Sequence, residues 1–168
     1  METSTDPVVA TEWRLTYQHH VGKYAAAFFA ALRDQQILGS VCASCARVNV
    51  PPKGFCEICF VATDSLVAVG NQGRLEAIAV LSTRDAAPGE KPTTVAFVRL
   101  DGATSSLANF VRVPDSAAGS EPKMLRIGGR VQAAFDPQPS GRMTDFWFEP
   151  ILDLESSQTI NNGGEPRE

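Results

Sequence analysis

The sequence predicts a mainly β protein with one helix near its N-terminus, in which a small metal-bound ribbon precedes a small closed barrel. Three observations support this fold class. The four cysteines form two Cys-x-x-Cys pairs within residues 42–59, residues 23–39 carry a helical apolar pattern, and the sequence beyond residue 63 consists of short β-like runs separated by turn residues. The 168 residues suit one ordinary domain, or a small domain with an appendage.

The first 22 residues are polar and irregular, and their composition sets limits on location and partners. Trp13, Leu15 and Tyr17 predict a strap that lies on another surface rather than a free tail. The segment has neither the basic flank nor the apolar centre of a secretory signal, which favours the cytoplasm, where thiols stay reduced.

The composition of the whole chain limits its partners. No apolar run approaches the roughly 20 residues of a membrane span. The net charge of −4 argues against a broad phosphate-binding surface. We therefore expect neither a membrane nor nucleic acid as the partner.

Residues 23–39 predict an amphipathic helix that Gly39 would end. The side chains at i, i+3, i+4 and i+7 spacing on its apolar face are Ala25, Phe28, Phe29 and Leu32. Two interpretations of Phe28, Phe29 and Leu32 stay open. They cover the core of the chain itself, as amphipathic helices usually do, or they bind a partner protein, because a helix that precedes two small modules has little core of its own to join.

Residues 40–62 form the cysteine block, with Cys42 and Cys45 in one pair and Cys56 and Cys59 in the other. The two-residue spacing folds each pair into a tight knuckle whose sulfurs face one point, so that four thiolates surround one ion. Zn²⁺ suits four sulfurs in a tetrahedron, and a site with four protein ligands is closed and structural. Two disulfides, four buried thiols or an iron centre with the same ligands are the alternatives.

The spacer between the two pairs is ten residues long. Pro51 and Pro52 favour an extended arm, and Gly54 permits a sharp return. Bound metal would replace the core that so short a segment cannot build, because metal-binding free energy acts as folding free energy in small ribbons. A closed site leaves no position for water or substrate, so we expect no zinc catalysis.

Residues 63–152 predict a barrel, and residues 153–168 a disordered tail. The β-like runs are SLVAVG, RLEAIAVLS, TTVAFVRL, SSLANFVRV, GRVQAAF and DFWFEP. Val131, Ala133 and Phe135 point one way, and Phe146 and Phe148 share a face opposite Trp147. Five or six strands without an intervening helix suggest a closed sheet, because closure removes exposed edges.

The order GSVCASCARVNVPPKGFCEICF, NQGRLEAIAVLS, VAFVRLDG, LANFV and IGGRVQAAFDP resembles a family that combines a rubredoxin-like zinc ribbon with a C-terminal OB-fold. This family is catalogued as a domain of unknown function and often called acyl-CoA-associated. The resemblance covers roughly residues 24–150. It is carried most specifically by the four cysteines, the VPP of residues 50–52 and the IGGRV of residues 127–131. Ala46 stands where relatives often carry glycine.

The resemblance implies a non-catalytic accessory subunit that sits beside a thiolase-like enzyme or a hot-dog hydratase and helps to shape its CoA-ester site. The N-terminal part looks most like small subunits of benzylsuccinate-pathway thiolases, with partners of steroid side-chain aldolases as the second choice. We expect a hetero-oligomer of two such chains on a thiolase dimer. Arg47 and Lys53 are candidates to hold CoA phosphates, against the alternative of ordinary surface charge.

No catalytic residue stands out in this chain. His19 and His20 are adjacent in a polar stretch without a visible partner, and the four cysteines are committed to metal. A different function class remains, because OB-folds often bind single-stranded nucleic acid through stacked aromatic side chains. The barrel aromatics here are few and occupy alternating positions that suggest the core, which argues against that class. Electron transfer through bound iron is the third hypothesis.

Overall fold

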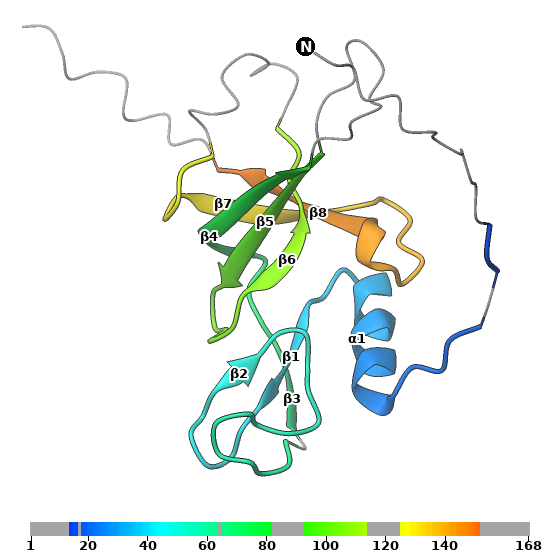
Figure 1. Ribbon diagram of the computed structural model, residues 1–168, viewed down its shortest axis with the longest axis vertical. Helices are drawn as coiled ribbons and strands as arrows, with labels where there is room; N and C mark the ends of the chain where they lie inside the picture. The colour runs from blue at the N-terminus through cyan, green and yellow to red at the C-terminus, as the bar shows by residue number, and fades with distance from the viewer. Residues whose placement is uncertain (1–13, 17, 64, 82–92, 114–124, 152–168) are drawn as a thin grey trace, which may run out of the picture.

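The computed structural model describes residues 14–16, 18–63, 65–81, 93–113 and 125–151. The predicted fold class is confirmed, because one helix, a small three-stranded sheet and a five-stranded sheet follow one another along the chain. In Figure 1 the small sheet lies below the larger one, and helix α1 stands beside the small sheet and below the β8 end of the larger one. The described residues include no helix with the length and apolarity needed to cross a bilayer. Trp13, Tyr17 and the expected disordered tail lie outside the described residues.

Helix α1 (Lys23–Arg33) ends earlier than the sequence predicts. Gln35 adopts the left-handed conformation with φ 56°, and the N–H groups of Gln35 and Gln36 donate to carbonyl oxygens of the last helical turn at 3.1 and 3.0 Å. This pair of bonds is a Schellman C-terminus, which usually uses glycine at the left-handed position. The prediction that Gly39 ends the helix is therefore wrong, and Gly39 lies inside strand β1 (Leu38–Val41).

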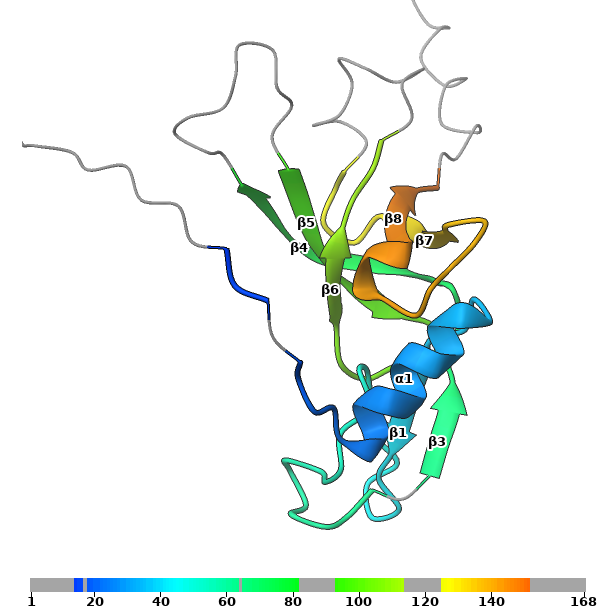
Figure 2. The ribbon, with the colours of Figure 1, turned by 90° about the vertical axis from the view of Figure 1, so that its right-hand side faces the viewer.

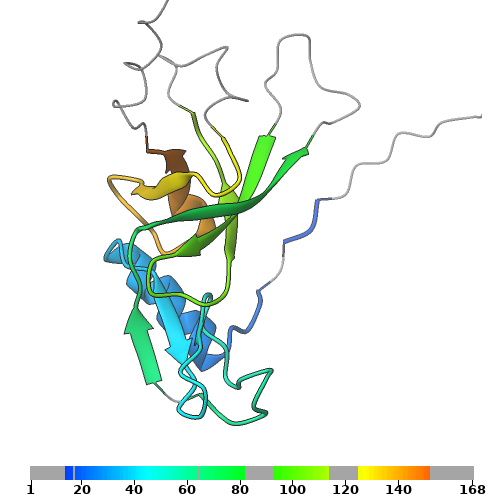
Figure 3. The ribbon, with the colours of Figure 1, turned by 90° about the vertical axis from the view of Figure 1, so that its left-hand side faces the viewer.

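The ribbon sheet places β1 between β2 (Val48–Asn49) and β3 (Ser65–Ala68), and both pairs are antiparallel. Strand β3 falls in the segment that the sequence analysis assigned to the barrel, yet all four of its residues pair with β1. It occupies the edge of β1 that β2 leaves open. Figure 3 shows β3 leading out of the ribbon towards the barrel.

The barrel consists of five antiparallel strands in the order β6-β5-β4-β7-β8. Their bounds are β4 (Gln72–Leu81), β5 (Thr93–Leu100), β6 (Leu107–Phe110), β7 (Arg130–Phe135) and β8 (Phe146–Pro150). Val111, just after β6, forms a parallel bridge with Phe148 of β8, and the N–H of Arg112 donates to the Phe148 carbonyl oxygen at 2.9 Å. These contacts join the two outermost strands, so the predicted closure is confirmed.

A β-bulge in β4 decides which side chains face outward. Leu75 pairs with Val98 and Ala77 with Phe97, which leaves Glu76 as the extra residue. Before the bulge Leu75 is buried, whereas after it Ala77 is exposed. The alternation predicted for β7 and β8 is confirmed, because Val131 and Ala133 are buried and Phe146 and Phe148 are fully buried.

One hydrophobic core runs through both modules, and α1 closes it. Phe28 is 2% exposed and Leu32 0%, and they share a cluster with Ile37 and Val50 of the ribbon and with the buried barrel side chains. The prediction that Phe28 and Leu32 bind a partner is therefore wrong, because ribbon and barrel together form a core for the helix to join. Figure 2 shows α1 running across from ribbon to barrel. Phe29 is partly buried against the same core, and its partner role stays a prediction.

Hydrogen bonds also fasten the ribbon to the barrel. The connection between β5 and β6 pairs with the outer edge of β2. The N–H of Thr104 donates to the Val48 carbonyl oxygen at 2.9 Å, and the N–H of Val50 donates to Ser105 Oγ at 2.7 Å. At the end of the helix, Arg33 Nε donates to the Ser140 carbonyl oxygen at 3.0 Å. The metal-binding ribbon is thus held in a fixed position against the barrel.

Asp145 organises the loop that contacts the end of α1. Asp145 is the last residue of the short 3₁₀ helix Met143–Asp145. Its carboxylate accepts hydrogen bonds from the N–H groups of Ser140, Gly141 and Arg142 at 2.6, 2.6 and 2.8 Å. The N–H of Arg142 first, then those of Ser140 and Gly141, hold the pKa of Asp145 below its usual range, because they bond the charged form.

Replacing Asp145 by asparagine is expected to lower the denaturation midpoint at neutral pH. A lowered folded-state pKa contributes stability that is present above the unfolded pKa and is lost as the pH falls through the folded pKa. The difference between Asp145→Asn and the wild type should therefore shrink on acidification below about pH 4. Urea denaturation at a series of pH values measures this difference in stability between the variant and the wild type. A difference that stays constant with pH would show that the charge of Asp145 is irrelevant.

Candidate metal centre

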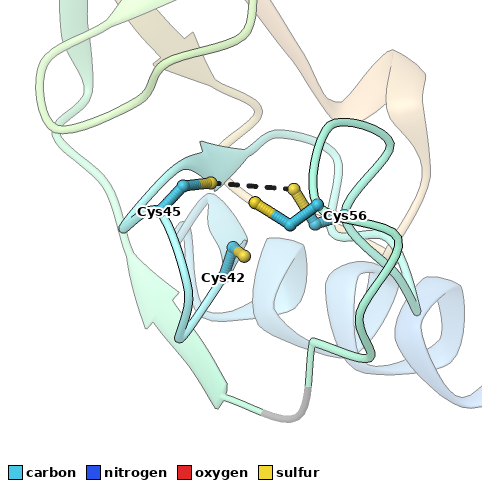
Figure 4. A group of neighbouring side chains, drawn as sticks. Cys42, Cys45 and Cys56 are labelled. Atoms are coloured by element: carbon cyan, nitrogen blue, oxygen red, sulfur yellow. Dashed lines mark hydrogen bonds between the residues drawn. The ribbon is translucent and has the colours of Figure 1, made fainter.

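Four cysteine side chains converge at the end of the ribbon. Cys42 follows β1 directly, Cys45 closes the first tight turn, and Cys56 and Cys59 occupy the equivalent positions of the second. The four sulfur atoms all lie within 4.8 Å of one another. In Figure 4 the side chains of Cys42, Cys45 and Cys56 point towards a common centre from two different loops. The structure therefore brings together the four ligands that the sequence predicts.

The two knuckles repeat one hydrogen-bond pattern. The N–H of Ala46 donates to the Cys42 carbonyl oxygen at 2.8 Å, and the N–H of Phe60 donates to that of Cys56 at 2.9 Å. Ala46 and Phe60 both adopt the left-handed conformation, with φ of 57° and 55°. This conformation favours glycine, so Ala46 and Phe60 are both non-glycine residues at positions where glycine would fit without strain. Each turn aims its pair of sulfurs at the same point.

The geometry fits a tetrahedral metal ion. Zinc–sulfur bonds of about 2.3 Å place tetrahedral sulfurs about 3.8 Å apart, and the sulfurs of Cys45 and Cys56 are 3.8 Å apart. Cys42 and Cys56 are fully buried, Cys59 is partly buried and Cys45 is exposed. Four thiolates would fill all four positions, which leaves none for a water or a substrate.

The thiol pKa values within the cluster are shifted in opposite directions. The backbone N–H groups of Cys59 and Ile58 lower the pKa of Cys56 to about 7. At Cys45 the N–H of Arg47 lowers the pKa, but hydrogen bonds with Cys59 and the other thiols, together with burial, raise it to about 12. A cation stabilises all four thiolates at once, because a coordinating thiol is deprotonated.

The spacer between the knuckles is fixed by contacts with the ribbon and the helix. Within the spacer, the N–H of Lys53 donates to Ser40 Oγ at 2.9 Å. Beyond the second knuckle, the hydroxyl of Tyr24 donates to the Thr63 carbonyl oxygen at 2.7 Å. A Cβ at Gly54 would lie 2.8 Å from Cε2 of Tyr24. Gly54 thus serves the close approach of the helix.

Arg47 and Lys53, the candidates for CoA phosphates, both lie exposed on the ribbon near Glu57. Lys53 Nζ forms an ion pair with Glu57 at 2.8 Å. The hydrogen bond from Lys53 first, then its charge and that of Arg47, lower the pKa of Glu57. The structure therefore brings the two cations to one side of the ribbon, where their role in binding CoA stays a prediction.

An exposed apolar surface on the barrel, which we call the outer sheet face, was not predicted from the sequence. Two cross-strand rows from β4, β5 and β6 form it, namely Ala77–Phe97–Ala108 and Ala79–Val95–Phe110. Phe97 is 44% exposed and Phe110 41%. The signal was present in the sequence, because β5 is apolar at both even and odd positions, so that one apolar set had to face outward.

A polar group borders one end of the outer sheet face. Arg99 Nε forms an ion pair with Glu76 at 3.0 Å, and the hydroxyl of Ser106 donates to the same carboxylate.

A second exposed apolar group surrounds the second knuckle of the ribbon. Its members are Phe55, Ile58, Phe60 and Val61, of which Phe60 is 83% exposed.

Family models match the chain in two consecutive stretches. The model for the ChsH2 rubredoxin-like zinc ribbon domain matches residues 29–64, and the model for the ChsH2 C-terminal OB-fold domain matches residues 66–136. The zinc ribbon match and the four-sulfur geometry together support a structural Zn²⁺ at these cysteines. A search among curated proteins found no match.

Two solved structures share the fold. A DUF35-family protein of unknown function from Sulfolobus solfataricus is 18% identical, with a TM-score of 0.60 over 77% of this chain and 87% of that chain. A chain of an Ltp2-ChsH2(DUF35) aldolase is 23% identical, with a TM-score of 0.57 over 79% of this chain and 98% of that chain. Because both identities are below 25%, these comparisons show a shared fold and nothing beyond it.

Proposed function

This chain belongs to the family defined by the ChsH2 zinc ribbon and C-terminal OB-fold domains, and we propose that it is a non-catalytic accessory subunit of a thiolase-type acyl-CoA enzyme. In this proposal the partner chain supplies the nucleophile and the bases. This chain completes the assembly and shapes part of the CoA-ester site. The assembly is cytoplasmic and contains two copies of each chain.

The outer sheet face is the observation that carries the proposal. An antiparallel sheet with one face on the core usually presents polar side chains to water on the other. Here β4, β5 and β6 present alanine, valine and phenylalanine on that side instead. A contiguous exposed apolar patch marks an interaction site, and a polar border such as the Glu76–Arg99 pair is typical of a protein interface. We infer that the partner enzyme buries this face.

The metal centre and the titratable residues favour a supporting role over catalysis in this chain. Four sulfur ligands close the coordination sphere of zinc, so water cannot be activated there. The thiols are committed to the metal, and His19 and His20 lie exposed on the N-terminal segment. The related fold in the Ltp2-ChsH2(DUF35) aldolase supports an enzyme complex as the setting.

We further propose that Arg47 and Lys53 hold phosphate groups of the CoA ester at the edge of the shared site. Both are exposed, and both lie close enough to Glu57 to lower its pKa. Phosphate accepts charge-assisted hydrogen bonds from such cations. Lys53 would exchange its ion pair with Glu57 for a phosphate oxygen when the ester binds.

The double substitution Phe97→Ser and Phe110→Ser tests the interface. Both rings are more than 40% exposed, so the variant is expected to keep its zinc and nearly all of its stability. It should lose the enzyme that co-purifies with the tagged wild-type chain from the native host. Ile127→Ser is the control, because Ile127 is 64% exposed and lies outside the outer sheet face. Retention of the enzyme by the double variant would show that this face is not the interface.

One observation favours a second function, the binding of single-stranded nucleic acid. The expectation that the barrel aromatics point to the core is wrong for Phe97 and Phe110, which lie on the second and third barrel strands, where OB-folds bind oligonucleotides. The neighbouring Arg99, however, is paired with Glu76, and the net charge is −4. Fluorescence anisotropy with a labelled oligothymidine, at low and high salt, decides between the two functions. Tight binding that weakens steeply with salt would favour the nucleic-acid function.

A further inference from the structure

The metal centre has a buried side and a solvent-facing side. Cys42 and Cys56 are fully buried, whereas Cys45 is exposed and Cys59 is partly buried. Each knuckle therefore contributes one inner and one outer ligand. Cys45 is thus the most exposed of the four ligands, and its sulfur lies 3.8 Å from that of Cys56 (Figure 4).

The chemistry of these sulfurs follows from their role as metal ligands. A thiol that coordinates zinc is deprotonated, and the thiolate is the form that reacts with peroxides. Susceptibility to oxidation follows thiolate character and exposure. Cys45 combines both properties, and it has a second thiolate within van der Waals reach of its sulfur.

We propose that Cys45 is an oxidation site at which a hydroperoxide converts the metal centre into a disulfide between Cys45 and Cys56 and releases the zinc ion. The Cys45 thiolate attacks the peroxide O–O bond, which gives a sulfenic acid and, from hydrogen peroxide, hydroxide. The Cys56 thiolate then attacks the sulfenic sulfur, the S–S bond forms, and a second hydroxide leaves. Two protons from solvent convert both hydroxides to water. The two sulfurs supply the two electrons that reduce the peroxide.

The disulfide would join the two knuckles to each other rather than close either one. It removes two of the four zinc ligands, one from each pair, so the remaining Cys42 and Cys59 cannot hold the ion in a closed site. Because metal-binding free energy acts as folding free energy in such ribbons, the reaction couples peroxide to loss of the ribbon structure. This inference concerns the chain itself and holds whether or not the proposed partner enzyme exists.

Treatment of the purified zinc-loaded chain with hydrogen peroxide tests the proposal. A chromogenic chelator follows zinc release, and mass spectrometry of tryptic peptides under non-reducing conditions locates the disulfide. Cleavage after Arg33, Arg47, Lys53 and Arg74 places Cys42 and Cys45 in peptide 34–47 and Cys56 and Cys59 in peptide 54–74. We expect zinc release in step with a cross-link between these peptides at Cys45 and Cys56. Dithiothreitol with added zinc should restore the wild-type metal content.

Cys45→His is the test variant, because a Cys₃His set still binds zinc. It removes the exposed cysteine and is expected to slow zinc release several-fold. Ser44→Ala is the control, because Ser44 lies exposed in the same knuckle and is not a ligand. It is expected to release zinc as fast as the wild type and to form the same disulfide. The proposal is overturned if the wild type keeps its zinc under peroxide, or if the disulfide forms within one peptide. The wild-type peptide map gives this answer even where a variant fails to fold.

Discussion

Replacing Cys42 by serine is expected to abolish zinc binding and to unfold the ribbon. Cys42 is fully buried at the end of β1, and its backbone fixes the first knuckle through bonds with Ala46 and Arg47. A serine hydroxyl does not replace a thiolate ligand. Structural zinc contributes apparent binding free energies of about 10–16 kcal/mol in small zinc-finger peptides, which is as large as the whole free energy of unfolding of a typical domain. Zinc content and hydrogen exchange across residues 38–63 measure the effect.

The control for this substitution is Ser44→Ala, because Ser44 lies exposed between the two ligands of the first knuckle. It should keep one zinc per chain and wild-type exchange rates. The Cys42→Ser chain should also fail to bind its partner enzyme. If the variant assembled normally with the partner and the complex turned over no substrate, the zinc site would have a catalytic role and its structural assignment would be refuted.

Replacing Leu32 by alanine is expected to destabilise the chain by about 2–5 kcal/mol, the range for truncation of a large aliphatic side chain in a core. Leu32 is 0% exposed and belongs to the cluster that joins the ribbon and barrel cores. Its truncation leaves a cavity where α1 packs on both modules. The midpoint of guanidinium denaturation of the zinc-loaded chain, monitored by circular dichroism, measures the loss.

Ala30→Ser is the matched change on the exposed side of the same helix, and it should alter the stability by about 0.5 kcal/mol or less. The comparison separates the two interpretations of the apolar helix face. A Leu32→Ala chain with wild-type stability but no affinity for the partner would contradict the core assignment and restore the partner-binding role of Leu32.

The cysteine site was predictable from the sequence because its determinants are local. A Cys-x-x-Cys pair closes its own turn, and two such pairs ten residues apart need only a short arm to meet. The strand runs of β5, β7 and β8 were predictable for a similar reason, since turn residues border them and their apolar content is high.

Other features depended on contacts that the sequence does not display. The end of α1 uses Gln35 in a conformation that favours glycine, so the sequence pattern points to Gly39 as the stop signal instead of Gln35. The bulge at Glu76 reverses the inward and outward positions along β4, and no residue pattern marks it. In β5 both sets of alternate residues are apolar, so only the fold decides that Phe97 faces outward. The burial of Phe28 likewise follows from the junction of ribbon and barrel.

Native mass spectrometry of the tagged chain purified from its native host, with a zinc measurement on the same sample, tests the accessory-subunit function most directly. We predict a complex that contains this chain and a thiolase-type enzyme in equal numbers, with one zinc ion per copy of this chain. The complex, but neither chain alone, should convert an acyl-CoA substrate. A zinc-loaded chain that emerges alone, or that carries single-stranded nucleic acid, would contradict the accessory-subunit function.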